Sequence, residues 1–126
     1  MTTEDFDKGL EIRKSVLGAE YVERSLASAD AFTQDFQELV TSYCWGHVWG
    51  REGLSKRDRS LLNLGMLAAL GRHEELQLHV RGALNNGLTM DEIKEALLQV
   101  AIYAGVPASL SAFKAARVIM QEEGLV

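Results

Sequence analysis

The chain has 126 residues, of which 47% are apolar and 25% are charged, a balance typical of a single domain over residues 1–126. The net charge of -5 argues against nucleic acid as the main partner, because phosphate binding favours a basic surface. No stretch approaches the roughly 20 apolar residues that span a bilayer, and the acidic N-terminal segment lacks a secretory signal pattern. We therefore expect a cytoplasmic protein that does not bind a membrane.

Frequent alanine and leucine, a single proline and the absence of β-branched runs favour helices over strands. A first helix is expected over residues 5–16 and ends at Gly18, and residues 19–26 are expected to form a connector. A second helix is expected over residues 29–48, where apolar side chains recur at helical spacing. The first helix carries a rough inner stripe that includes one charged residue: Phe6, Leu10, Ile12, Arg13 and Leu17.

A third helix is expected after Ser55, which is placed to cap it, with Asp58 three residues further on. The run over residues 61–70, LLNLGMLAAL, is apolar on most faces and ends at Gly71. A helix of this kind is typically buried all round. We therefore expect either a central helix or an interface between subunits.

Three more helices complete the predicted fold. One covers residues 74–85, and the next follows Thr89, which forms a T-x-x-E capping box with Glu92. The last has Pro107 in its first turn and ends near residue 122. The sequence predicts an all-α protein, a compact bundle of about six helices.

The fourth predicted helix carries the most informative group of polar residues. Arg72, Glu75 and His79 are three and four residues apart, so they share one face of the helix. A carboxylate one turn from an imidazole can fix its tautomer and raise its basicity, which suits proton transfer. Gly82 lies on the same face and would clear space for a ligand. The alternative is a solvated surface pair, with Gly82 admitting another helix.

Two tryptophans and three arginines are the other candidates for a binding site. Trp45 and Trp49 lie one turn apart and would either wall a pocket or pack in the core. Arg51 follows them on a glycine-flanked loop, Arg59 opens the apolar third helix, and Arg24 follows the first helix. A guanidinium fork suits a carboxylate, although each arginine taken singly also fits a surface role.

No motif for a metal or a cofactor accompanies these residues. His47, His73 and His79 are scattered, without an HExxH motif or a carboxylate-rich ligand set. The single cysteine, Cys44, makes no disulfide and no CxxC pair, and is expected to be a buried thiol. We expect neither a metal nor a cofactor.

A series of short motifs extends over nearly the whole chain. Between residues 53 and 108 they are Gly53-Leu54, Arg59-Ser60-Leu61, Met66-Leu67, Glu75-Leu76 with His79, Asn85-Asn86-Gly87, residues 91–95, Gln99 and residues 103–108. Upstream they are residues 9–17, Arg24-Ser25-Leu26, Phe36-Gln37-Glu38, Trp45-Gly46, Trp49 and Arg51. In these motifs the chain resembles the carboxymuconolactone decarboxylase family, which belongs to the AhpD-like superfamily.

Alkylhydroperoxidase-type members of that superfamily use a CxxC pair ahead of a histidine. Counted back from His79, the two cysteine positions are occupied here by Arg72 and Glu75. Peroxidase activity needs the thiolates of such a pair, so we do not expect it here.

The resemblance implies a lyase of aromatic-compound catabolism in the β-ketoadipate pathway, and a homo-oligomer, commonly a hexamer. The implied reaction converts 4-carboxymuconolactone into 3-oxoadipate enol-lactone and CO2. The lactone carbonyl of the substrate takes up the electron pair, so no cofactor is required. On this interpretation His79 and Glu75 are catalytic. The residues implied to bind the substrate and shape its pocket are Arg51, Arg59, Arg24, Trp45 and Trp49.

Two other functions remain open at this point. A family homologue would act on a different lactone or small carboxylic acid. A non-catalytic oligomer would bind a small ligand, and Glu75 and His79 would then be a surface pair.

Overall fold

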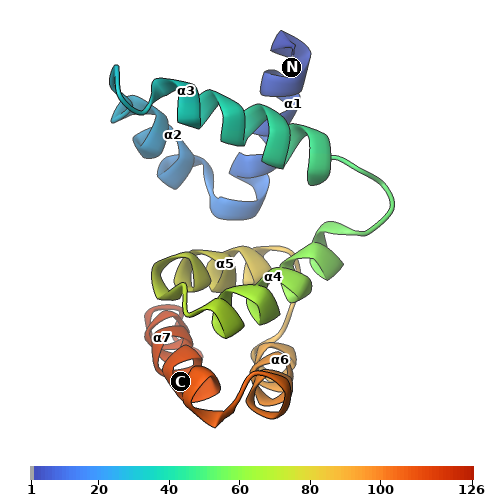
Figure 1. Cartoon of the computed structure of the whole chain (residues 1–126), viewed down its shortest axis with the longest axis vertical. Helices are drawn as coiled ribbons and strands as arrows, with labels where there is room; N and C mark the ends of the chain where they lie inside the picture. The colour runs from blue at the N-terminus through green and yellow to red at the C-terminus, as the bar shows by residue number, and fades with distance from the viewer. Residues whose placement is uncertain (1) are drawn as a thin grey trace. The chain divides into compact units, whose positions relative to one another are not determined.

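The computed structural model describes residues 2–126, and every regular element in that range is a helix. The prediction of an all-α protein is confirmed (Figure 1). The chain divides into two compact units, residues 1–55 and 56–126, and each is described by itself. Within the described range, no helix has both the length and the apolar character needed to cross a membrane.

The first unit contains α1 (Thr3–Leu17), α2 (Ala19–Ala27), α3 (Gln34–Leu39) and the π-helix η1 (Val40–Val48), which continues α3 without a break. The connector predicted over residues 19–26 is wrong, since this segment is α2. Gly18 has a φ of 95°, a conformation that glycine adopts without strain, so one helix ends there and the next begins immediately.

The helix predicted over residues 29–48 begins later than expected. Asp30 Oδ1 accepts the backbone N–H groups of Phe32 and Thr33, and this local turn competes with helical hydrogen bonding until Gln34. The described residues therefore form seven α-helices and one π-helix instead of about six helices.

Two glycines allow the backbones of α1 and η1 to touch. A Cβ atom on Gly9 would lie 1.8 Å from the carbonyl oxygen of Thr41, and one on Gly46 would lie 2.5 Å from that of Asp5. Only a residue without a side chain fits such a contact. The π-helix thus packs directly on the first helix of the unit.

Arg13 lies in the same interior, at 6% exposure. Its Nη1 donates to Gln37 Oε1 and to Thr41 Oγ1, both at 3.1 Å. Burial lowers the pKa of this guanidinium. The predicted inner stripe of the first helix therefore includes a buried cation that is held by neutral polar groups.

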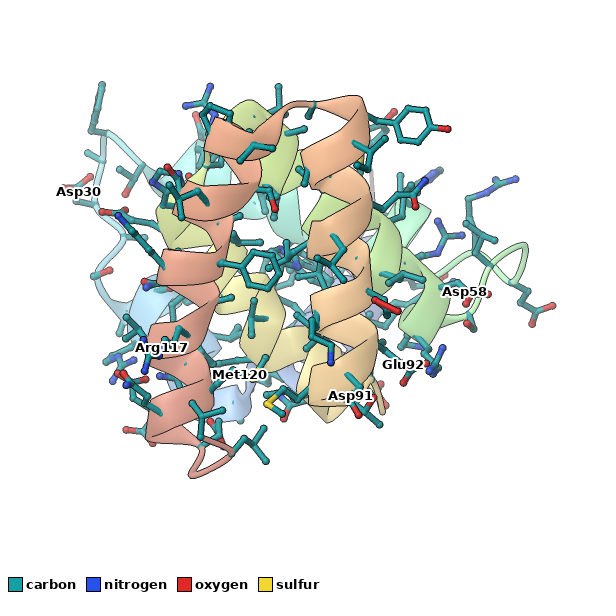
Figure 2. The ribbon with its side chains drawn as sticks, turned by 90° about the horizontal axis from the view of Figure 1, so that it is seen from below. Asp30, Asp58, Asp91, Glu92, Arg117 and Met120 are labelled. Carbon is teal, nitrogen blue, oxygen red and sulfur yellow. The ribbon has the colours of Figure 1, made fainter. Side chains whose placement is uncertain are left out.

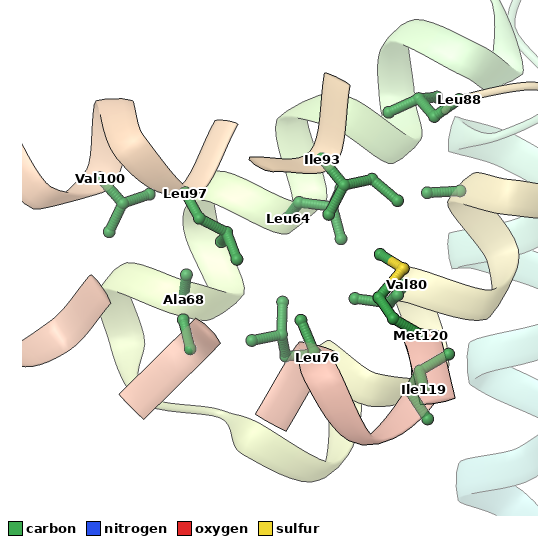
Figure 3. Close-up of a cluster of buried hydrophobic side chains, with 13 residues drawn as sticks. Leu64, Ala68, Leu76, Val80, Leu88, Ile93, Leu97, Val100, Ile119 and Met120 are labelled. Carbon is green, nitrogen blue, oxygen red and sulfur yellow. The ribbon is translucent and has the colours of Figure 1, made fainter. Parts of the chain in front are cut away.

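The second unit consists of α4 (Lys56–Leu70), α5 (His73–Asn85), α6 (Met90–Tyr103) and α7 (Val106–Glu122). Helix α4 packs on α5 and α6, and α7 packs on the same two helices. All four contribute to one apolar core (Figure 3). Its buried members are Leu64, Ala68, Leu76, Val80, Ala83, Leu88, Ile93, Leu97, Val100, Ala112, Ala116, Ile119 and Met120.

The predicted helix starts in the second unit are confirmed. Thr89 and Glu92 form a complete capping box at α6, and Pro107 lies in the first turn of α7. Glu92 also pairs with Arg57 of α4, so the same carboxylate links the beginnings of two helices. Figure 2 shows Glu92 beside Asp91 at the start of α6. Arg57 and the Thr89 backbone N–H lower the pKa of Glu92.

The apolar sequence of α4 suggests a helix that is buried on all sides. Within the chain, only one side of α4 is buried. Its buried residues are Ser60, Leu64 and Ala68, whereas Met66 and Leu70 are 47% and 70% exposed. The expectation that α4 is buried all round within the chain is therefore wrong. The apolar outer face of α4 is left without a partner from its own unit.

Candidate active site

Glu75 and His79 lie one turn apart on α5. The helix is anchored by Leu76, Val80 and Ala83, which are buried in the core. Glu75 and His79 each precede an anchor residue, so they lie along the edge of the buried stripe. Glu75 is exposed and His79 is partly buried. This position gives the imidazole a partly dry environment and leaves the carboxylate in contact with solvent.

The imidazole of His79 is neutral at pH 7. Burial disfavours the charged form and lowers the pKa of His79 to about 4, while the nearby carboxylate of Glu75 opposes this shift. The two side chains therefore interact electrostatically, as their spacing predicts. A neutral imidazole carries one N–H donor and one acceptor nitrogen.

Asn63 of α4 is a third member of this group, and the sequence analysis missed it. Its Nδ2 lies 3.4 Å from His79 Nδ1, in a partly buried contact between α4 and α5. Asn63 is the only polar side chain in the run LLNLGMLAAL. A buried amide within an apolar helix needs a hydrogen-bond partner. This requirement could have identified Asn63 as a candidate from the sequence.

Arg59 precedes Asn63 by four residues, so it lies on the same face of α4, one turn earlier. Its side chain is partly buried. The second unit thus contains four residues of the candidate site, Arg59 and Asn63 on α4 and Glu75 and His79 on α5. His79 interacts with both Glu75 and Asn63, and Arg59 lies one turn from Asn63 on α4.

The remaining candidates belong to the first unit. Trp45 and Trp49 are buried there and stack on each other, with ring centroids 4.7 Å apart and an angle of 25° between planes. Arg51 is exposed in the segment after η1. Arg24 is exposed on α2, with Nη1 3.8 Å from Glu20 Oε1.

The group on α4 and α5 has the parts needed for acid–base chemistry on an anionic molecule. It combines a neutral imidazole, a solvent-exposed carboxylate and a neighbouring guanidinium. Over residues 2–126, no three His, Cys, Asp or Glu side chains gather in a way that would hold a metal ion. The candidate active site of this helical protein therefore consists of Glu75 and His79 on α5 with Asn63 and Arg59 on α4.

The comparison with known sequences places the chain within one family. The sequence model of the carboxymuconolactone decarboxylase family matches residues 34–118. This protein belongs to the carboxymuconolactone decarboxylase family.

Two relatives carry names that describe an activity. The chain is 44% identical over 120 residues to a 4-carboxymuconolactone decarboxylase from Acinetobacter baylyi, a match that covers 95% of this chain and 90% of the relative. It is 50% identical over 107 residues to a nitrosuccinic acid decarboxylase from Metarhizium robertsii, covering 85% of this chain and 75% of the relative. Both names describe the loss of CO2 from a small acid.

Proposed function

We propose that this protein is a carboxy-lyase that converts 4-carboxymuconolactone into 3-oxoadipate enol-lactone and CO2, in the protocatechuate branch of the β-ketoadipate pathway. The observation that carries the proposal is the 44% identity to a decarboxylase of that name over 95% of the chain. The contact of His79 with Asn63 and its electrostatic interaction with Glu75 support it, because the reaction needs a donor and a proton carrier at one place.

The substrate provides its own electron sink. When the carboxylate on the ring carbon leaves as CO2, its bonding electrons move through the ring double bond to the lactone carbonyl oxygen. The resulting dienolate is then protonated on the carbon next to that carbonyl, which gives the enol-lactone. The protein must stabilise the oxyanion and provide a proton, and no cofactor is required. Donors aimed at a developing oxyanion usually contribute most to such a reaction.

His79 is our candidate for the oxyanion donor. Because its pKa is about 4, it is neutral at pH 7 and acts through an N–H hydrogen bond instead of delivering a proton from an imidazolium. Glu75, one turn away and exposed to solvent, is then the group that passes a proton from water to carbon.

Arg59 is the first candidate for binding a substrate carboxylate, because it lies one turn from Asn63 and a guanidinium can bind a carboxylate through two hydrogen bonds. Arg51 and Arg24 are the next candidates. The stacked pair Trp45 and Trp49 would contribute by giving the first unit a rigid interior.

Nitrosuccinic acid is the second candidate substrate, and the 50% identity over 107 residues favours it. The two substrates share one chemical unit: a carbon that bears the leaving carboxylate, a CH2-carboxylate arm and an electron sink. The sink is the unsaturated lactone in one molecule and the nitro group in the other. The retained arm would meet the same arginine in both, so the shape of the pocket around the sink decides between them.

We also propose that the protein forms a cytoplasmic homo-oligomer, a hexamer by family resemblance. Within the second unit, α4 and α6 border an open groove of about 860 Å³, whose lining includes Leu61, Leu62, Ala96 and Tyr103. A monomeric protein rarely exposes a large contiguous apolar patch. A second copy of the chain would cover this face.

Site-directed variants test the assignment of the chemistry to α5. With 4-carboxymuconolactone, His79→Gln should lower kcat about 100-fold, the usual effect of losing an oxyanion donor. His73→Gln is the matched control, because His73 begins the same helix but is exposed. Full activity of the His79 variant, or equal losses in both variants, would contradict the assignment.

A further inference from the structure

The contact between Asn63 and His79 identifies a residue that acts through the imidazole. We propose that Asn63 is a positioning residue, whose amide N–H donates to His79 Nδ1 and thereby holds the ring in the tautomer that carries its proton on Nε2. Its catalytic meaning rests on the proposed function, whereas the tautomer itself does not.

A neutral imidazole has a single N–H, on either Nδ1 or Nε2. Asn63 directs Nδ2, which can only donate, toward Nδ1 at 3.4 Å. Nδ1 must then be the acceptor, and the proton is on Nε2. In this tautomer Nε2–H is a donor, as a developing oxyanion requires.

The packing between α4 and α5 fixes where Asn63 meets the ring. Its sequence neighbour Leu64 is fully buried in the core, and Ser60, one turn earlier, is also fully buried. Asn86, just after α5, donates from Nδ2 to Ser60 Oγ at 2.8 Å. This second polar link between the same two helices holds their register. A contact of 3.4 Å is long for a hydrogen bond, and such bonds often shorten when substrate binds.

The choice of asparagine also fits a ring that stays neutral. An aspartate at position 63 could only accept a hydrogen bond, so it would place the proton on Nδ1 and leave Nε2 as an acceptor. Its charge would also favour the imidazolium. Glu75 on α5 and Arg59 on α4 are charged groups one turn from His79 and Asn63, and the proposal changes neither of them.

The test reads the tautomer directly by NMR of protein labelled with ¹⁵N in histidine. The His79 signals are assigned by their loss in His79→Gln, and His47 and His73 serve as internal controls in every spectrum. The wild type should show His79 protonated on Nε2. Asn63→Asp should move the proton to Nδ1 and raise the pKa of His79, and Asn63→Leu, which has a similar volume, should leave a mixture of tautomers.

Turnover provides the second readout. With 4-carboxymuconolactone, Asn63→Asp should lower kcat about 100-fold, as expected for a lost oxyanion donor, and should change KM much less. A wild-type ring protonated on Nδ1, or an Asn63→Asp variant that keeps Nε2–H, would overturn the inference whatever the activity. A correct tautomer in an enzyme that releases no CO2 would contradict the proposed function and leave the role of Asn63 in place.

Discussion

At the scale of single residues, the environment of His79 matters as much as its identity. The spacing of Glu75 and His79 predicted that the two side chains share a face, and they do interact. The sequence favoured a more basic imidazole, because a carboxylate lies one turn away. Burial outweighs that carboxylate, and the pKa of His79 is lowered. A pattern of spacing identifies neighbours on one helix but contains no measure of burial by another helix.

The lowered pKa makes the stability of the fold depend on pH. The folded value is about 4 and the ordinary value is 6.5, so the unfolded chain binds this proton first as the pH falls. The contribution of neutral His79 should therefore be complete above about pH 6.5 and should decrease towards pH 4, by up to about 3 kcal/mol.

Chemical denaturation at fixed protein concentration measures this effect. The loss of unfolding free energy between pH 6.5 and pH 4.5 should be smaller in His79→Gln than in the wild type, while His73→Gln should behave as the wild type. If His79→Gln shows the wild-type dependence, the imidazole is not buried as described.

Asn63 shows what the sequence could not provide at this scale. Its partner is 16 residues away on another helix, and only the packing of α4 on α5 brings the two together. The partners of Arg13 could not be predicted either. Its place in an apolar stripe indicated that the side chain points inward, but Gln37 and Thr41 come from a different segment.

At the scale of helices, the sequence predicted starts and stops best where a residue has a specific local role. The capping box at Thr89 and the first-turn position of Pro107 were read correctly, because these signals act within four residues. The start of α3 was predicted too early, since the turn at Asp30 competes with helix formation. The π-helix was not predicted, because the residue spacing of η1 fits an ordinary helix.

The contact between α1 and η1 gives a direct test of the first unit. In Gly9→Ala the new Cβ atom would meet the Thr41 carbonyl oxygen at 1.8 Å, so the two helices must separate. We expect a loss of about 3 kcal/mol in unfolding free energy, the upper range for overpacking. Gly53→Ala is the control within the same unit, because its Cβ atom would meet nothing within 4 Å. Equal stability of the two variants in urea unfolding would contradict the close packing.

At the scale of the whole molecule, α4 is an apolar helix whose outer face is exposed, and an interface with a second copy of the chain would explain this exposure. On α4, the buried residues are Ser60, Leu64 and Ala68. Leu62 and Met66 are exposed. Sequence alone predicted burial from composition but could not tell burial within a chain from burial between chains. The groove along α4 and α6 supports the second alternative.

Light scattering tests that proposal. The wild type should have a mass several times that of one chain, and Leu62→Glu should lower it by placing a charge in the groove lining. Leu125→Glu is the control, since Leu125 is similarly exposed but lies beyond α7. A monomeric wild type would contradict the proposal of a homo-oligomer.

The release of CO2 from 4-carboxymuconolactone tests the proposed function directly. The lactone is generated in situ because it is labile. The assay contains a chelator and no added cofactor, and nitrosuccinate is measured in parallel. We predict one CO2 per lactone consumed, a rate proportional to enzyme concentration, and a higher kcat/KM for the lactone than for nitrosuccinate. Turnover of nitrosuccinate without turnover of the lactone, or no turnover of either by folded protein, would contradict the account.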